Sequence, residues 1–368
     1  MAADPRVRKL AETLVGYSLN IKPGEFVVIG TQPAAAPLIE ELYRAILLAG
    51  ANPVTNIAMP GLARLKLKHG SDEQLRWMSP YDQMAVEQAD VRISIDANTN
   101  TRELANADPA RQAIAASARR ELMGTMMQRS ARGDLRWCVT LFPTEALAQD
   151  ANMSLPDFED FVYDVCFLNE DDPAAKWREL HAQQERLVNY LAGKREVRLV
   201  GEGTDLTLGI SGRAFINCAG DSNFPDGEFF TGPEESKVNG TVRFSFPAVF
   251  GGREVEDVRL TFEEGRVVQA SAKSGQDFLE QMLDLDDGAR RLGEFAFGNN
   301  PNVRNYTKNI LFDEKMGGTV HMALGAAYPE TGGLNESALH WDRVCDLRRG
   351  GEVYVDGVLF AKDGAFVI

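Results

Sequence analysis

The sequence predicts two domains of different architecture: an α/β domain with a doubly wound parallel sheet, then an α+β domain with a mainly antiparallel sheet. Three observations support this prediction. The first half alternates short apolar runs with stretches of helical periodicity, which is typical of parallel sheets. The second half consists mostly of short segments of alternating apolar and polar residues, which is typical of antiparallel strands. A chain of 368 residues is also long for one hydrophobic core.

The first half begins with a helix, a strand and a second helix. Asp4 suits the N-cap of a helix and Pro5 its first position, where the missing N–H of proline costs nothing. A turn at 22–25 (KPGE) separates this helix from a short apolar strand at 26–29. The stretch 35–48 has its apolar residues on one side of a helix, and a glycine that suits a C-terminal cap follows it.

Strands and helices continue to alternate up to a polar stretch near Gly193. We expect, in order, strand 53–59, strand 91–95, helix 109–129, strand 137–141, helix 155–167 and helix 173–191. Gly193 follows the last of these helices, and polar residues follow it, which is typical of a boundary between domains. We therefore predict an N-terminal α/β domain over 1–193 and a C-terminal domain over 194–368.

The second half has the turns and the alternation of an antiparallel sheet. Asp356-Gly357 lies between two apolar runs and is a common sequence for a two-residue type I′ hairpin turn. A second hairpin turn is predicted at 263–265, and a helix at 277–285. The expected strands in this half include 197–200, 206–210, 242–246 and 258–262. Neither half contains an internal repeat or a low-complexity segment.

Composition and charge argue against several classes of function. The hydrophobic content of 44% and charged content of 25% are ordinary for a soluble globular protein. A formal net charge of −15 opposes binding to nucleic acid or to an anionic membrane. The N-terminus lacks the apolar run of a signal peptide, no segment approaches the roughly 20 apolar residues of a membrane span, and the four cysteines form no CxxC pair. We expect a cytoplasmic protein with reduced thiols.

Residues 313–342 contain two of the four histidines and the pattern of half a metal site. The segment 320–324 alternates like a strand and includes His321. His340 and Asp342 are two positions apart, so an extended segment directs imidazole and carboxylate to the same side. A loop rich in proline and glycine separates the two pieces and allows them to converge on one cation.

Three glutamates are further candidates. Glu228 follows a tight turn, Glu294 stands beside apolar residues where an unpaired charge is costly, and Glu314 precedes His321 by seven residues. Each has an ordinary alternative as a solvated glutamate, and His321 alone suits a core histidine. Together, four carboxylates and two imidazoles suit two divalent ions that share a bridging carboxylate. HExxH, P-loop and GxSxG motifs are absent from the sequence.

Several extended segments resemble, in the same order, the M29 family of dinuclear metallo-aminopeptidases, the thermophilic aminopeptidase family. The resemblance covers the second half well, and the KPGE turn with the strand and helix after it adds a looser match in the first half. The segments are NFPDGEFFTGP (223–233), GEFAFGNNPN (293–302), TKNILFDEK (307–315), GTVHMALGAAYPETGG (318–333) and NESALHWD (335–342). Matches of this length in one order are highly specific.

The resemblance implies a function and a set of site residues. It implies a cytoplasmic metallo-aminopeptidase that acts on short peptides, with 194–368 as the catalytic, metal-binding domain. It also implies two divalent ions (zinc, cobalt, manganese or magnesium) and a homodimer that encloses the site. By motif position, the family's ligands and its catalytic tyrosine fall on Glu228, Glu294, Glu314, His321, His340, Asp342 and Tyr328. Two alternatives remain open at this point: another dinuclear hydrolase such as an amidase, and a catalytically silent protein that binds metal or peptide.

Overall fold

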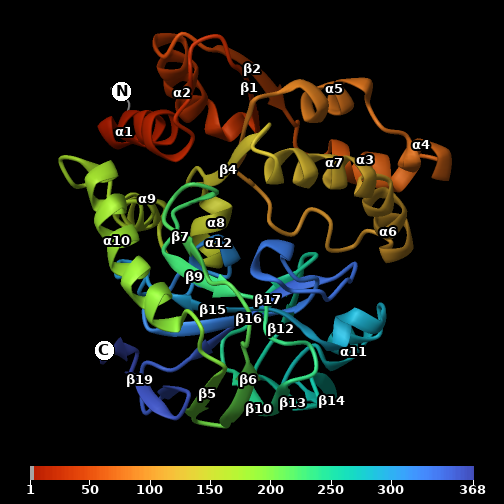
Figure 1. Ribbon diagram of the computed structural model, residues 1–368. Coiled ribbons are helices and arrows are strands. Elements are labelled where there is room, and N and C mark those ends of the chain that lie inside the picture. Colours follow the sequence, from red (N-terminus) through yellow and green to blue (C-terminus); the bar gives the residue numbers. More distant parts are fainter. Residues whose placement is uncertain (1–3) are drawn as a thin grey trace. The chain divides into compact units, whose positions relative to one another are not determined.

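The structure is a computed structural model that describes residues 4–368. Its packing divides the chain into two compact units (Figure 1). Unit 1 comprises the chain up to Lys176 together with Gly220–Pro225, and unit 2 comprises Trp177–Ala219 and Asp226–Ile368. The first crossing between units falls within helix α10 (Pro173–Leu191). The domain boundary expected after Gly193, at the end of the same helix, stays a prediction.

Unit 1 is built on a parallel sheet, as the alternation of strands and helices predicts. The strand order is β2-β1-β3-β4-β8, and every neighbouring pair is parallel. β2 lies on one side of β1 and β3 on the other, which is the change of direction found in doubly wound sheets. The strands are β1 (Phe26–Thr31), β2 (Asn52–Ile57), β3 (Val91–Asp96), β4 (Arg136–Leu141) and β8 (Asn223–Phe224).

The helices of unit 1 follow the predicted pattern except that the short helix at Glu145–Asp150 is not predicted and one predicted helix is broken in two. The sequence predicts one helix over 109–129, whereas α6 and α7 meet at Arg119. The Arg119 N–H donates to Ala116 O, an i→i−3 bond that tightens the last turn of α6. The helices are α1 (Pro5–Thr13), α2 (Ala36–Leu48), α3 (Leu62–His69), α4 (Asp72–Arg76), α5 (Pro80–Gln88), α6 (Pro109–Ala118), α7 (Arg120–Ala131), α8 (Glu145–Asp150) and α9 (Leu155–Val165), with a π-helical turn at Leu14–Ser18 and a 3-10 turn at Pro33–Ala35.

Unit 2 contains the antiparallel sheets that the second half predicts. The larger sheet has the order β14-β13-β10-β6-β5-β18-β19-β20. The predicted type I′ turn joins β18 and β19, and Asp356 and Gly357 both have positive φ, 48° and 79°, as this turn requires. The strands are β5 (Glu196–Gly201), β6 (Thr204–Gly209), β10 (Val238–Phe244), β13 (Val258–Glu263), β14 (Arg266–Ser271), β18 (Glu352–Val355), β19 (Val358–Lys362) and β20 (Ala365–Phe366).

A second antiparallel sheet of unit 2 has five strands in the order β17-β16-β15-β9-β7 (Figure 1). Its strands are β7 (Ile216–Cys218), β9 (Glu228–Thr231), β15 (Leu292–Gly298), β16 (Thr319–Gly325) and β17 (His340–Asp346). Its apolar face packs on the larger sheet, where the ring centroid of Phe297 in β15 lies 5.5 Å from that of Phe360 in β19. On the same face, the ring centroids of Phe297 and Phe229 of the neighbouring strand β9 are 4.9 Å apart. The remaining elements are a hairpin of β11 (Ala248–Phe250) and β12 (Arg253–Val255), α11 (Gln276–Leu283), α12 (Ile310–Asp313), and 3-10 turns at Asp287–Arg290 and Pro329–Thr331.

Two observations concern the described chain as a whole. The four cysteines form no disulfide within residues 4–368. Over the same residues, no helix has both the length and the apolar character that crossing a membrane requires. Both units therefore depend on the packing of their apolar residues rather than on covalent cross-links.

Candidate metal centre

One face of the five-stranded sheet carries the ionisable residues, because side chains alternate along each strand. Phe295 and Phe297 belong to the hydrophobic core, so Glu294 points to the opposite face of β15. The pairing of β15 with β16, and of β16 with β17, puts His321 and Asp342 on the same face as Glu294. The apolar face of the sheet therefore supplies stability, while its other face gathers charge.

All six predicted ligands lie in one cluster. Their oxygen and nitrogen atoms form three groups, and within each group the ligand atoms lie within 4.8 Å of one another. The groups are Glu228, Glu294 and His321; Glu294, His340 and Asp342; and Glu314, His321 and Asp342. Because Glu294, His321 and Asp342 each belong to two groups, the three groups are parts of one continuous site.

Glu294 links the two histidines. His321 Nε2 lies 3.4 Å from Glu294 Oε1 and 3.1 Å from Glu228 Oε2. His340 Nε2 lies 3.3 Å from Glu294 Oε2 and 3.5 Å from Asp342 Oδ2. Each oxygen of the Glu294 carboxylate thus faces a different imidazole, and this is the arrangement that a carboxylate bridging two cations needs.

The ring of His340 is oriented by the loop that precedes β17. Its Nδ1 lies 2.9 Å from the carbonyl oxygen of Ala326. A carbonyl accepts but does not donate, so Nδ1 carries the proton of this hydrogen bond. In the neutral ring, Nε2 then keeps its lone pair, which points toward Glu294 and Asp342 and is available to a metal.

Several buried atoms of the cluster lack a hydrogen-bond partner among the residues that the structure describes. They are Oε2 of Glu228, both ring nitrogens of His321 and Oδ1 of Asp342. The 3.1 Å contact between Glu228 Oε2 and His321 Nε2 is not aligned as a hydrogen bond. A buried polar atom left unpaired costs about 1–3 kcal/mol, so native proteins pair nearly all of them. Converging carboxylate oxygens and imidazole nitrogens are ligands for divalent transition ions. The donor set therefore fits metal binding.

Burial and mutual attraction determine where the cluster holds its protons. Burial raises the pKa of Glu314 to about 8, although Lys315 opposes this shift. Burial also raises the pKa of Glu294, but the nearby imidazoles of His321 and His340 outweigh it and bring the pKa to about 2. Burial lowers the pKa of His340, whereas Asp342 and Glu294 raise it to about 10. Metal ligation requires neutral imidazoles, so metal binding releases protons.

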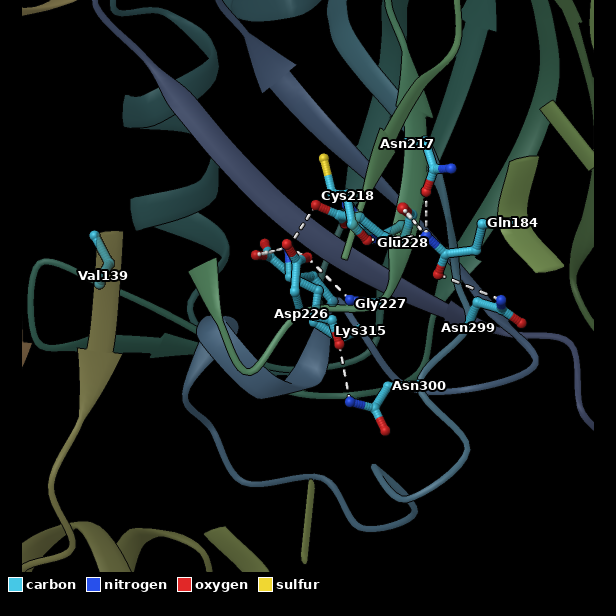
Figure 2. A network of polar contacts seen from close by, with 12 residues as sticks. Val139, Gln184, Asn217, Cys218, Asp226, Gly227, Glu228, Asn299, Asn300 and Lys315 are labelled. Atoms are coloured by element: carbon cyan, nitrogen blue, oxygen red, sulfur yellow. Dashed lines mark hydrogen bonds and ion pairs between the residues drawn. The ribbon is translucent and has the colours of Figure 1, made fainter. Parts of the chain in front are cut away.

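A buried lysine that the sequence reasoning did not single out lies beside the cluster. Lys315 is 0% exposed, and its ammonium contacts the carboxylates of Glu228, Glu314 (2.7 Å) and Asp226 (3.5 Å) (Figure 2). Burial alone would lower the pKa of Lys315, but Glu228 and Glu314 raise it well above its ordinary value, so the charge persists. Lys315 thus offsets part of the negative charge and fixes two of the ligand carboxylates.

Gln184 of α10 holds the start of β9 in place. Its Nε2 lies 3.0 Å from the carbonyl oxygen of Glu228 and 2.9 Å from that of Cys218 (Figure 2). Gln184 is fully buried, so these contacts are shielded from water. Sequence periodicity does not single out Gln184 or Lys315. The one available indication is that Lys315 directly follows Glu314, a candidate ligand.

Tyr328 lies against the cluster without belonging to any of the three ligand groups. Its ring contacts the rings of His340 and Phe230 edge-on, with both centroid distances 5.2 Å. Burial raises the pKa of the Tyr328 phenol, and the nearby carboxylates of Glu294 and Asp342 raise it further. The hydroxyl therefore stays protonated at neutral pH and is a hydrogen-bond donor rather than a metal ligand.

Comparison with known proteins extends the likeness to the whole chain. The family model described as thermophilic metalloprotease (M29) matches residues 3–366. Aminopeptidase 2 of Geobacillus stearothermophilus is 31% identical, over 97% of this chain and 94% of the relative. Aminopeptidase T of Thermus thermophilus is 27% identical, over 96% of this chain and 94% of the relative.

Solved structures share the fold. Wild-type AmpT from Thermus thermophilus matches with a TM-score of 0.86 at 24% identity, covering 99% of both chains. A 2,5-dihydroxypyridine dioxygenase from Pseudomonas putida KT2440 matches with a TM-score of 0.61 at 14% identity, covering 100% of this chain and 98% of the other. The second match has a different named activity, so the fold by itself does not determine the reaction.

Proposed function

We propose that this chain, which belongs to the thermophilic metalloprotease (M29) family, is a metal-dependent aminopeptidase that removes the N-terminal residue from short peptides. The observation that supports this most directly is the buried cluster of four carboxylates and two imidazoles with unpartnered ligand atoms. Its relatives over nearly the full length are named aminopeptidases, which favours peptide hydrolysis over other reactions of a divalent metal site.

Two divalent ions are proposed for the site. Glu228, Glu294 and His321 would hold one, and Glu294, His340 and Asp342 the other, with Glu294 as the bridging carboxylate. Glu314 shares a group with His321 and Asp342 and is proposed as the remaining ligand. The ions, when bound, would activate a water molecule and polarise the scissile carbonyl. Zinc, cobalt, manganese and magnesium are the proposed candidates.

Tyr328 is proposed as the catalytic residue outside the metal shell. Its phenol donates a hydrogen bond to the substrate's carbonyl oxygen as that oxygen gains negative charge. The protonated state that burial favours is the state that this role needs. Lys315 keeps Glu228 and Glu314 in position and remains charged. A free α-amino group is an additional ligand for a divalent ion, which would restrict cleavage to the first residue.

The setting of the reaction is also a proposal. We infer that the protein acts in the cytoplasm as a homodimer that encloses the site, so that short peptides enter and folded proteins do not. The family resemblance supports this inference. Size-exclusion chromatography with light scattering measures the oligomeric state directly, and a monomer that retains full activity would contradict the role of the dimer.

One assay tests the proposed function. Chelator-treated protein is given a dipeptide or an aminoacyl-p-nitroanilide, with and without added Zn²⁺, Co²⁺ or Mn²⁺. We expect release of the first amino acid only when metal is present. The N-acetylated dipeptide is the matched control, because acetylation removes the charged amine. Equal turnover of the blocked and free peptides would favour an amidase, and metal binding without turnover would favour a silent binding protein.

A further inference from the structure

Unit 2 contains a second buried group with unmet hydrogen bonds, and it lies beside the metal cluster. Arg343 follows Asp342 on β17 and is only 1% exposed. Among residues 4–368, none of its three guanidinium nitrogens has a hydrogen-bond partner, and no carboxylate lies within ion-pair distance of it. Its guanidinium carbon lies 3.7 Å from the centroid of the Trp341 ring, a cation–π contact.

An aromatic ring is a poor replacement for a counter-ion. A buried guanidinium loses its hydration and normally recovers it through a carboxylate or several carbonyl oxygens. The guanidinium of arginine stays charged at neutral pH. A planar cation with five donors and no acceptor nearby therefore points to an anion that comes from outside the chain.

Arg343 lines a cavity of about 150 Å³ that follows the outer edge of β17. β17 is the edge strand of its sheet, so a cavity along this edge meets side chains from both faces of the strand. His340 and Asp342 of the metal cluster line the same cavity as Arg343. The opposite wall is apolar and aromatic and includes Phe246, Phe250 and Tyr306.

Apart from His340 and Asp342 of the metal cluster, the other charged groups of this cavity have partners. Lys308 Nζ lies 3.1 Å and 3.2 Å from the two carboxylate oxygens of Glu254. Asp313 Oδ1 accepts hydrogen bonds from the backbone N–H of Thr307 (2.7 Å) and from its hydroxyl (2.9 Å). Outside the metal cluster, Arg343 is thus the charged residue of the described lining whose hydrogen-bonding capacity is unused.

We propose that Arg343 is a carboxylate-binding subsite for the peptide whose amino end lies at the metal cluster. This inference rests on the proposed function. His340, Asp342 and Arg343 line one cavity, so a peptide whose amino end lies at the metal cluster extends into the space that Arg343 lines. The carboxylate is either the C-terminus of a dipeptide or an acidic side chain at its second residue. A guanidinium binds either through two parallel hydrogen bonds.

The kinetic test compares substrates that differ only in one carboxylate. Leu-Leu and Leu-Leu-amide test the C-terminal source, and Leu-Glu-amide and Leu-Gln-amide test the side-chain source. In Arg343→Met, KM for the carboxylate form should rise about 10- to 100-fold more than KM for its uncharged counterpart, the range expected for a charge-assisted hydrogen bond. Arg343→Lys should recover part of this preference because it keeps the charge. The pair that responds identifies the source.

Lys308→Met is the matched control for this test. It removes one positive charge from the same cavity, but that charge already has a partner in Glu254. We expect it to change KM for the acid and amide forms equally. If Arg343→Met also affects both members of every pair equally, or affects none, the subsite is refuted and Arg343 only packs on Trp341.

A binding measurement separates this inference from the proposed function. N-acetyl-Leu-Leu should raise the thermal unfolding midpoint of the parent more than its amide does, and this difference should disappear in Arg343→Met. Without ligand, Arg343→Met should unfold at the same temperature as the parent or higher, because it removes an unpaired buried charge. If no peptide is cleaved but the carboxylate still stabilises through Arg343, the proposed function fails and the subsite stands. No stabilisation by either probe, together with unaltered KM ratios, overturns the subsite.

Discussion

The parallel sheet of unit 1 and the five-stranded sheet of unit 2 differ in whether their polar side chains find hydrogen-bond partners within the protein. At the carboxyl ends of the unit 1 strands, polar groups pair with one another: Thr31 Oγ1 donates to Ile95 O (3.0 Å), and Gln32 Nε2 donates to Asn98 Oδ1 (2.7 Å). In unit 2, every residue of β15 and β16 is buried, yet Glu294 and His321 stand within these strands.

This difference distinguishes polar groups whose hydrogen bonds are made within the chain from polar groups that need a ligand. Both sets are ordinary polar residues at the edge or face of a buried sheet. The unit 1 groups find partners within the chain, whereas His321 and Asp342 retain unpartnered atoms among the described residues. Placing such groups in a core is costly unless something supplies the missing bonds. Unpartnered atoms also occur in unit 1, at Ser18, Tyr81 and Arg136, but only in unit 2 do they belong to the converging ligand groups of the described chain. This convergence locates the chemistry in unit 2, although unit 1 has the fold more often associated with ligands.

Metal removal should affect the two units most unequally. We expect a chelator to abolish peptidase activity and to lower the stability of unit 2, since a ligand at 1,000 times its Kd contributes about 4 kcal/mol. Hydrogen exchange measured by mass spectrometry should become faster in β15–β17 and stay unchanged in β1–β4. Full activity of verifiably metal-free protein would contradict the proposal that unit 2, unlike unit 1, needs a bound metal.

Substitution of single ligands should give the next largest effect. His340→Ala and Asp342→Ala should lose metal and turnover together, on the order of 10³-fold, because loss of an outer-shell partner alone costs 10- to 100-fold in affinity or activity. Gln32→Ala is the matched variant in unit 1, where it removes a pair between protein groups. Mass spectrometry measures the bound metal, and kinetics on one dipeptide measures the turnover of the same variants. Gln32→Ala should keep its metal.

A smaller effect is expected where the site residue is not a ligand. Tyr328→Phe should keep both the metal and the substrate affinity and lose about 10²- to 10³-fold in turnover, because the missing hydrogen bond acts mainly in the transition state. The measurement is kcat and KM with metal content on the same sample. A variant that turns over like the parent would make Tyr328 a packing residue, and one that loses metal would place it among the ligands.

The smallest effect should come from the exposed side chains of helices α6 and α7 in unit 1. None of the residues of α6 and α7 is buried, and Met123 is 56% exposed. Met123→Ser should therefore change the free energy of unfolding by no more than about 0.5 kcal/mol and leave activity within about twofold. Leu38→Ala on α2, whose side chain is fully buried, is the contrasting variant and should cost about 2–5 kcal/mol. Chemical denaturation measures both.

Elements with their own local pattern could be predicted from the sequence. The hairpin at Asp356-Gly357 and the alternating strand that includes His321 depend on neighbouring residues, and both are present. Strand β8, Asn223–Phe224, joins the parallel sheet of unit 1 from the second half of the chain. Two residues give no periodicity, so only tertiary pairing reveals it. The break between α6 and α7 at Arg119 likewise has no sequence pattern that predicts it.

The site shows the same limit. The identity of the six ligand candidates followed from extended motifs, but their convergence depends on strand register, which no motif contains. Lys315 and Arg343 would ordinarily be assigned to the surface because of their charge. Their burial follows from packing by distant segments: Glu228 contacts Lys315 from 87 positions away. A charged residue's exposure is thus a tertiary property, and sequence periodicity cannot supply it.

The spread of the ligands along the chain also determines when a newly made molecule can first acquire its cation. The ribosome delivers β1 to β4 early, but β8 only after Asn223, and the ligands appear in the order Glu228, Glu294, Glu314 and then the histidines. Asp342 is the last of the six ligand candidates to be made. Between Glu228 and His321, a nascent chain therefore has ligand glutamates but no ligand histidine. All six ligands can hold metal only after Asp342 has been made, and a chain cut short before His340 has no complete centre to load.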